Sequence, residues 1–241
     1  MSTFLTAEWR KLIMAQYAID PTILTPYLPT GVELDLFGPN RTCYVSLVAF
    51  LFDRVRVKRL PIPFHTRFEE VNLRFYVRRT EPDGTAKRGV VFIREFVSRA
   101  AITLIANSLY EEPYATLPTH STITTTAETL SVRYSWQHHK LWQSLAVEAS
   151  PTPQPIPAGS VEEFLTEHYW GYTKRTNGTT SAYEVKHPRW LIYPIHQATI
   201  EADFAQLYGP AFALLNRQPP SSVLLAEGSP VSVHSGSRLR A

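Results

Sequence analysis

Hydrophobic and polar residues alternate strictly in the segment RFEEVNLRFYVRR, residues 67–79. One face of this segment carries Val71, Leu73, Phe75 and Val77, and the other carries Glu70, Asn72, Arg74, Tyr76 and Arg78. A two-residue period predicts a β-strand with one buried face. The second face points either to solvent, as an ordinary polar surface, or into the interior of a barrel, where it would line a pocket.

Similar patterns predict strands through most of the chain. The turn at residues 81–84 joins the strand at 67–79 to an antiparallel partner at 89–96. The predicted strands cover residues 11–18, 32–37, 42–52, 54–58, 67–79, 89–96, parts of 121–136, 172–174, 182–187, 223–226 and 231–234.

Short helices are predicted between these strands. Asp20 and Pro21 open one that ends near residue 28, and Ser98 is expected to cap a second with apolar positions 101, 104, 105 and 109. Ser160 and Glu163 form a capping box for a helix reaching about residue 170, and residues 199–208 are expected to form the last.

These elements indicate an α+β fold that is mainly antiparallel β, with helices as lids on a barrel or sandwich. The proline-rich stretch at 150–157 is interpreted as a loop rather than a domain linker, so residues 1–241 are expected to form a single domain. The tail at 235–241 is expected to fray.

Composition narrows the function classes. The net charge of +3 is too balanced to indicate a nucleic-acid partner. The longest apolar run, at 44–52, is too short to span a bilayer, and charged residues interrupt the N-terminus where a secretion signal would lie. Cys43 is the only cysteine, which leaves no internal disulfide. We therefore expect a cytoplasmic protein with no membrane partner.

Six segments in order resemble a known family: IDPTILTPYLPTGVELDLF, FEEVNLRFYV, VVFIREF with LYEEPYATL, EEFLTEHYWGYT, YEVKHPRW and LLAEGSPVSV. Together they are similar to the uncharacterised bacterial YqjF-like family, a domain of unknown function of the acetoacetate decarboxylase-like superfamily. The resemblance covers nearly the whole chain. It implies an acetoacetate decarboxylase-like fold, in which a central antiparallel barrel is wrapped by a second sheet and encloses a pocket.

One departure from acetoacetate decarboxylase concerns its mechanism. That enzyme uses a lysine that forms a Schiff base, located between an Arg-Glu step and a Tyr-Pro segment. Here Arg94-Glu95 and residues 109–113 resemble these flanks, but the span 98–107 contains no lysine. Arg99 cannot replace it, because a guanidinium stays protonated. We therefore predict no Schiff-base decarboxylation.

Candidate site residues follow from the polar face and from the resemblance. Glu70 is the candidate catalytic acid or base, and Arg74 would bind a carboxylate or carbonyl oxygen. The candidate ligand-binding residues are Asn72, Tyr76, Arg94, Tyr110, Tyr114, His168, Tyr172 and His187. Each also has a structural alternative, such as an ion pair for Arg94 or a core histidine for His187. No metal or cofactor motif is present, so we expect neither.

Three functions remain open at this stage. The first is a lyase or hydrolase that acts by acid–base chemistry on a small oxo or carboxylated compound. The second is a non-catalytic binding or sensory module for a small molecule on the same scaffold, so whether the chain is an enzyme stays undecided. The third is a self-associating structural protein, and formation of a homo-oligomer is left open in every case.

Overall fold

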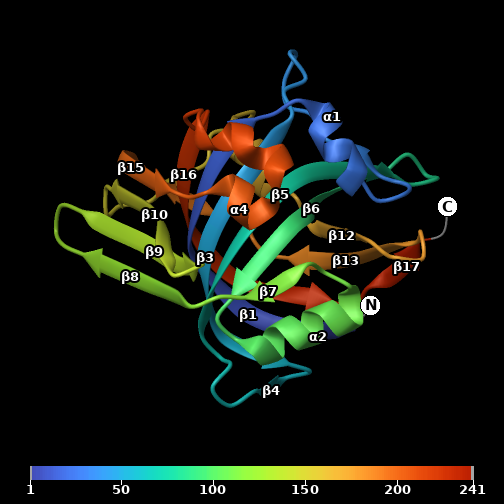
Figure 1. Ribbon diagram of the computed structural model, residues 1–241, viewed down its shortest axis with the longest axis horizontal. Helices are drawn as coiled ribbons and strands as arrows, with labels where there is room; N and C mark the ends of the chain where they lie inside the picture. The colour runs from blue at the N-terminus through green and yellow to red at the C-terminus, as the bar shows by residue number, and fades with distance from the viewer. Residues whose placement is uncertain (1, 240–241) are drawn as a thin grey trace.

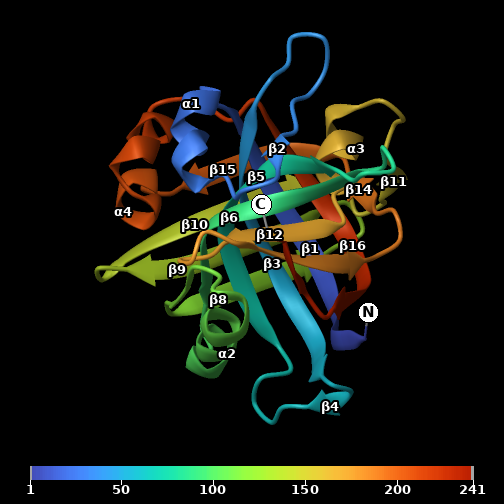
Figure 2. The same ribbon diagram turned by 90° about the vertical axis from the view of Figure 1, so that its right-hand side faces the viewer.

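The computed structural model describes the chain from residue 2 to residue 239, except for the side chains at positions 105, 106 and 108–110. Within that part, the strands form a 13-stranded sheet and a separate 4-stranded sheet. Figures 1 and 2 show the smaller sheet packed against one side of the larger, which curls around on itself. The fold is therefore mainly β with few short helices, as the sequence predicted.

The larger sheet closes into a ring. Its strands follow the order β1 (Thr3–Ala18), β3 (Tyr44–Val57), β5 (Phe68–Thr80), β6 (Ala86–Val97), β12 (Trp170–Lys174), β13 (Thr180–Lys186) and β16 (Ser222–His234), and β16 pairs again with β1. All of these pairings are antiparallel except β6 with β12. Shorter strands extend the ring: β2 (Glu33–Leu34), β4 (Leu60–Pro61), β7 (Tyr114–Thr116), β11 (Gln154–Pro155), β14 (Leu191–Tyr193) and β17 (Ser237–Leu239).

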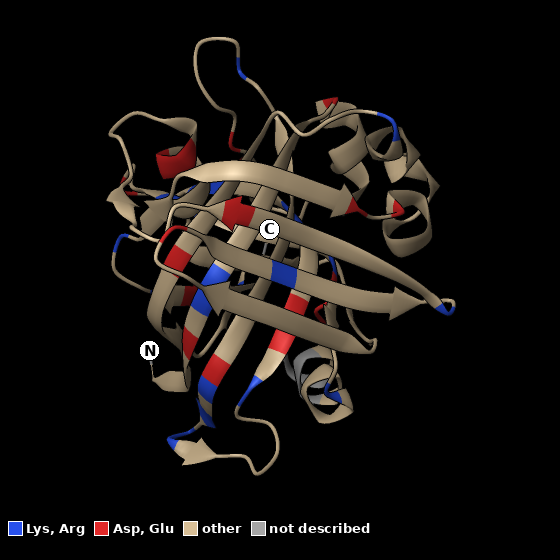
Figure 3. Cartoon of the chain, turned by 90° about the vertical axis from the view of Figure 1, so that its left-hand side faces the viewer, with Lys and Arg blue, Asp and Glu red and all other residues tan. Residues whose placement is uncertain are grey.

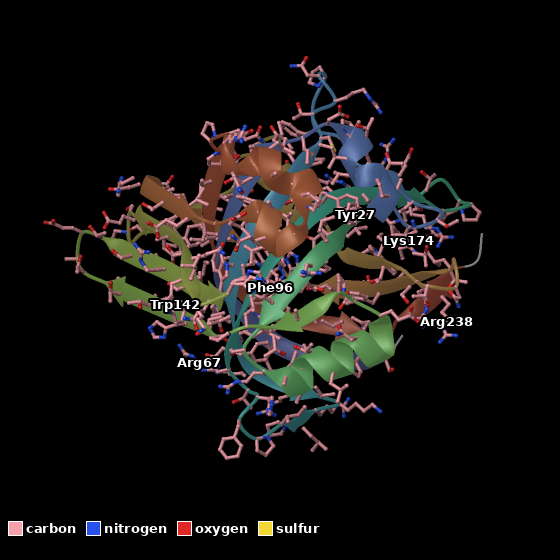
Figure 4. The ribbon with its side chains drawn as sticks, viewed as in Figure 1. Tyr27, Arg67, Phe96, Trp142, Lys174 and Arg238 are labelled. Carbon is pink, nitrogen blue, oxygen red and sulfur yellow. The ribbon has the colours of Figure 1, made fainter. Side chains whose placement is uncertain are left out.

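The smaller sheet wraps the outside of this ring and creates a second core. It contains β15 (Ile195–Glu201), β10 (Leu141–Ala149), β9 (Leu130–His138) and β8 (Thr119–Thr125). Side chains such as Tyr134 and Trp136 fill the space between the sheets. Figure 4 shows the contrast in position between Phe96, buried at the middle of the molecule, and Trp142, which lies exposed at the periphery.

Strand β5 is buried on both faces because it lies between the two cores. Val71, Leu73 and Phe75 pack toward the smaller sheet, whereas Tyr76 belongs to the core inside the ring. On that inner face Glu70, Asn72 and Arg74 are also less than one tenth exposed. From Glu70 to Tyr76 the polar face predicted from the sequence therefore points into the ring, whereas Arg78 is exposed.

Helices cover the ends and flanks of the ring. They are α1 (Pro21–Leu24), η1 (Thr25–Tyr27), α2 (Ala100–Tyr110), α3 (Val161–Thr166), α4 (Phe204–Tyr208) and η2 (Pro210–Asn216). Asp20 caps α1 by accepting from the Thr22 amide, and the Ser160 side chain caps α3 by accepting from Glu163, as predicted. Among the described residues no helix is both long and apolar enough to cross a membrane.

Three predicted helix boundaries were wrong. Residues 199–201 belong to β15, because pairing with β10 takes up their backbone groups, and α4 begins only after Asp203 caps it. Helix α3 ends at Thr166, because Trp170 and Gly171 pair with β6 instead. Ser98 does not cap α2: Arg99 is the N-cap residue, and it makes no side-chain cap hydrogen bond.

The chain ends are more ordered than predicted. The two strands expected at 223–226 and 231–234 form one continuous strand, β16, and the predicted break lies at Gly228, where the backbone turns to positive φ. Ser237–Leu239 pairs with β13, so this part of the tail expected to fray is ordered, and residues 240–241 lie outside the described residues.

The outer surface of β1 and β16 is held by ion pairs. Arg10 contacts Glu8 at 2.7 Å and Glu227 at 3.4 Å, and Lys11 pairs with Glu227. Figure 3 shows such oppositely charged segments adjoining on neighbouring strands. Because each group has a partner at this surface, the cluster is a structural network.

Candidate functional site

A cavity of about 140 Å³ lies inside the ring. Its walls come from β1, β3, β5, β6, β12 and β13, together with the end of α3. A buried cavity of this kind, lined by apolar side chains and a few converging polar groups, is typical of a small-molecule site.

The inner face of β5 supplies a continuous polar wall. Glu70, Asn72 and Arg74 point to the same side, because they alternate with the outward Val71 and Leu73. The Asn72 amide donates to Glu70 Oε1 at 2.9 Å. This bond joins two side chains of the same strand and fixes their positions relative to each other.

Three carboxyl groups converge on the cavity. Glu70, Glu95 and Glu112 are 2%, 1% and 7% exposed, respectively. The Tyr114 hydroxyl donates to Glu70 Oε2 at 2.9 Å, and the Tyr183 hydroxyl donates to Glu112 Oε1 at 2.5 Å. A side-chain hydrogen bond joins Glu70 to Glu95, so at least one of those two carboxyls carries a proton.

The electrostatics separate the roles of these carboxyls. Burial raises the pKa of Glu70, although Asn72, Tyr114 and the Arg74 charge oppose the rise. Burial and then the charges of Glu112 and Glu70 raise the pKa of Glu95 well above its ordinary value. Of the two, Glu95 therefore has the more strongly raised pKa. Burial also raises the pKa of Glu112 to about 7.

Within the described part of the chain, Arg74 is a buried cation with no carboxylate at ion-pair distance, although its charge acts on Glu70. Its residue is 8% exposed, Nη2 lies 3.7 Å from the Met14 sulfur, and Nε has no hydrogen-bond partner. The guanidinium also lies 5.9 Å from the centre of the Tyr76 ring. Leaving a buried charge incompletely hydrogen-bonded is costly, so these free donors mark a position where an anionic ligand would bind.

His168 supplies a free acceptor on the wall near Arg74. Its Nε2 lies 3.1 Å from Asp35 Oδ2, and Asp35 also accepts from Arg88 at 2.6 Å. Burial lowers the pKa of His168 to about 4, so the ring is neutral and Nε2–H donates to Asp35. The buried Nδ1 then carries a lone pair without a partner.

The structure brings together six of the residues predicted from the sequence. Those that line the cavity are Glu70, Asn72, Arg74, Tyr114, His168 and His187. His187 stacks on Trp190 with ring centres 4.3 Å apart, at the edge of the cavity.

Two other predicted residues, Tyr76 and Tyr172, point elsewhere. The Tyr76 hydroxyl forms a hydrogen bond with the Ser46 hydroxyl, and its ring packs against the Arg74 and His168 side chains. Tyr172 donates to the Lys87 carbonyl and packs in the outer core. The side chain of Tyr110, also predicted, lies outside the described residues.

Arg94 is also misplaced by the sequence pattern, because a β-bulge changes the alternation of β6. Leu73 pairs with Arg94 but Arg74 pairs with Phe92, so Ile93 is an extra residue. Phe92 and Glu95 consequently both face the cavity. Arg94 is exposed on the other side, where it donates to the Leu207 carbonyl.

Sequence reasoning missed Glu95, Glu112 and Tyr183 as site residues. Glu95 is itself the Glu of the Arg-Glu step that resembles acetoacetate decarboxylase. That step was the feature of the sequence that could have identified it as a site residue. Glu112 lies between the αL residue Glu111 and Pro113, in a turn that directs adjacent side chains to opposite sides. Only the tertiary structure shows that this turn places the Glu112 side chain in the cavity wall.

The polar groups of the site suit an organic ligand better than a metal ion. In the described part of the chain, no group of three or more His, Cys, Asp or Glu is arranged to hold a metal ion. No lysine lines the cavity there either; Lys174 bonds to the Pro26 carbonyl and Lys186 pairs with Glu184 at the surface. The groups available for chemistry among the described lining residues include carboxyls, phenols, the Arg74 guanidinium and the imidazoles of His168 and His187.

The chain has an acetoacetate decarboxylase-like fold. The enduracididine biosynthesis enzyme MppR complexed with pyruvate superposes with a TM-score of 0.68, at 13% identity, over 100% of this chain and 92% of that chain. Acetoacetate decarboxylase from Legionella pneumophila superposes with a TM-score of 0.62, at 13% identity, over 100% of this chain and 90% of that chain.

The chain belongs to the DUF2071 family, described as an uncharacterized conserved protein, whose model matches residues 6–230. It is similar to the uncharacterized protein YqjF of Bacillus subtilis (strain 168), with 28% identity over 189 residues, which cover 76% of this chain and 73% of that protein. The family resemblance stated from the sequence is therefore confirmed.

Proposed function

We propose that the chain is an acid–base enzyme, of lyase or hydrolase type, that acts on a small oxo or carboxylated compound without a Schiff base. The observation that carries the proposal is the geometry of the cavity: an unpaired buried Arg74 shares it with three buried carboxyls. Groups whose surroundings move their pKa values apart are the usual acid and base of an active site.

The roles follow from the protonation states. Arg74 holds the anionic group of the substrate through its free donors. Protonated Glu95 donates to the substrate carbonyl oxygen, and the Glu70 carboxylate accepts a proton from the adjacent carbon in a lyase or from water in a hydrolase. His168 Nδ1 accepts a hydrogen bond from the substrate near Arg74.

Two structures of one structural neighbour support a substrate of this kind. MppR is described as complexed with pyruvate and, in a second structure, with the condensation product of pyruvate and imidazole 4-carboxaldehyde. Pyruvate is an oxo acid, and the condensation product is formed from it. At 13% identity the likeness concerns the fold, so the substrate class here depends on Arg74 and the carboxyls.

A non-catalytic binding module is the second candidate, and the lack of a cavity lysine favours it. It predicts that small oxo acids bind through Arg74 and undergo no chemical change. The two functions therefore differ in proton transfer, not in binding.

The experiment is exchange of carbon-bound protons into deuterated water, followed by NMR, for pyruvate, acetoacetate and larger oxo acids. It detects the base step whatever the final product. Glu70→Gln and Glu95→Gln are each compared with the matched control Glu69→Gln. Glu69 neighbours Glu70 but bonds to Thr119 and Ser121, outside the cavity.

Enzyme-dependent exchange that falls at least a hundredfold in Glu70→Gln and not in Glu69→Gln supports the proposal. Binding without exchange, and without product formation from any compound, supports the binding module instead. A substrate-dependent adduct trapped by borohydride would overturn the exclusion of a Schiff base.

A further inference from the structure

The cavity changes character along β5. Arg74, at the α3 end, influences His168 directly, and Glu70 and Asn72 follow it. Beyond them Phe68 lines the wall at the other end. Figures 1 and 2 both show α2 and β4 together at this second end, and Figure 2 shows α3 at the opposite end.

An aromatic wall adjoins the carboxyls. Phe50 pairs across the sheet with Glu70, and Phe52 pairs with Phe68, with ring centres 4.9 Å apart. Trp9 packs edge-on against Phe50 and Phe52, at 5.3 Å and 5.9 Å. These rings present carbon surface to the cavity immediately next to the acid–base groups.

The apolar lining continues to the end of the ring. Val57 and Ile102 belong to the cavity wall, and each lies beside exposed apolar side chains. Val57 pairs with Leu60, which is 70% exposed, and Ile102 shares α2 with Leu104, which is 68% exposed. Among the described residues that line the cavity at this end, a ligand leaving the polar wall meets apolar side chains such as Phe68, Val57 and Ile102, which do not solvate a second charge.

The volume limits the apolar part of the ligand. Protein interiors are normally close-packed, so unfilled space beside aromatic side chains is unusual. The cavity measures about 140 Å³. An apolar protein cavity of about 150 Å³ admits benzene. This volume is that of the whole cavity, polar wall included, so the apolar part of a ligand inside it is at most one ring, and two fused rings exceed it.

We propose that the ligand is a small amphipathic oxo acid: its carboxylate binds Arg74, and its non-polar body, about the size of one aromatic ring, lies against Trp9, Phe52 and Phe68. The inference rests on the proposed function in taking Arg74 as the anchor of an anion. It goes beyond that function by excluding wholly polar short-chain acids as the preferred ligands.

Titration calorimetry with three matched probes tests the inference. Phenylpyruvate has the acid and the ring, pyruvate lacks the ring, and phenylacetone lacks the carboxylate. Each buried CH₂ increases affinity about fourfold, so phenylpyruvate is expected to bind at least tenfold more tightly than pyruvate. It is also expected to bind at least tenfold more tightly than phenylacetone, and indole-3-pyruvate is expected to bind more weakly than phenylpyruvate.

A pair of variants locates the apolar part. Val233 lines the cavity opposite Leu5 and is partly exposed, so Val233→Phe narrows the apolar end without touching Glu70 or Arg74. We expect a tenfold or greater loss of phenylpyruvate affinity and no change for pyruvate. Ser232→Phe places the same bulk on the next residue, which faces the outer surface, and is expected to change neither.

Equal affinities for pyruvate and phenylpyruvate overturn the inference, as does a neutral ketone that binds as tightly as the acid. No binding of phenylpyruvate up to about 10 mM also overturns it. Preferred binding of phenylpyruvate without proton exchange leaves the ligand class standing and refutes the proposed catalysis, so the two failures are distinguishable.

Discussion

Glu112 makes the stability of the protein depend on pH. Burial raises its pKa from an ordinary 4.5 to about 7. As pH rises from 4.5 to 7, the unfolded chain releases this proton while the folded chain retains it, so the free energy of unfolding falls. Each pKa unit corresponds to about 1.4 kcal/mol, and the full penalty above pH 7 is therefore about 3 kcal/mol.

The substitution Glu112→Gln removes this penalty. The glutamine carbonyl can still accept the hydrogen bond from the Tyr183 hydroxyl. A fixed packing cost of the amide is the same at every pH, so the informative quantity is the difference in stability between variant and wild type at two pH values. Between pH 5 and pH 8 the variant should gain about 2.5 kcal/mol relative to wild type.

The assay is urea unfolding of both proteins at pH 5 and pH 8. Glu111→Gln is the matched control, because the Thr176 backbone N–H and the Arg175 charge lower the pKa of that neighbouring carboxyl. Its stability relative to wild type should not rise with pH. If Glu112→Gln shows the same difference from wild type at both pH values, Glu112 is not held protonated by the fold and the assignment of a raised pKa is wrong.

Three further predictions concern the same cavity. Arg74→Met should stabilise the ligand-free protein by about 1–2 kcal/mol in thermal unfolding, because it removes a buried charge without an ion pair. The same substitution should abolish the binding of anions measured by calorimetry. Destabilisation would contradict this view of Arg74. The His168 ring should remain neutral at pH 5.5 by NMR. Because its pKa is depressed in the folded protein, the free energy of unfolding should fall by about 3 kcal/mol as pH falls from 6.5 toward 4. The variant His168→Phe should show no such loss. Gly171→Ala should cost about 1–3 kcal/mol in thermal unfolding, because the new Cβ would lie 2.2 Å from the Tyr183 ring; an unchanged melting temperature would show that Tyr183 is free to move.

Local patterns predicted much of the β structure. Alternation located β5 and its partner β6, and the capping box located the start of α3. The ends of elements were less predictable. Residues 199–201 joined a strand because β10 offered hydrogen bonds to their backbone, and a preference within a few residues carries no information about a strand far away in the chain.

Site residues that lie on a single strand could be predicted from the sequence. Those whose position depends on other parts of the fold could not. Glu70, Asn72 and Arg74 were found because alternation places them on one face of β5. Arg94 lies away from the cavity because the bulge at Ile93 shifts the alternation of β6, and Glu95 was missed for the same reason.

The sequence by itself determined that β5 has one apolar and one polar face, that the chain lacks a lysine in the span where acetoacetate decarboxylase has one, and that the chain resembles the YqjF-like family. These are properties of neighbouring residues, and side-chain alternation reports them directly. Tertiary structure alone decided that the polar face is buried. Closure of the ring between β13 and β16, and the packing of the smaller sheet on its outside, place both faces of β5 in a core. It also brought Glu95 and Glu112 to Glu70, because convergence of carboxyls from separate segments depends on how strands pair across the whole chain. The raised pKa values follow from that convergence and from burial, which no single segment of the sequence contains.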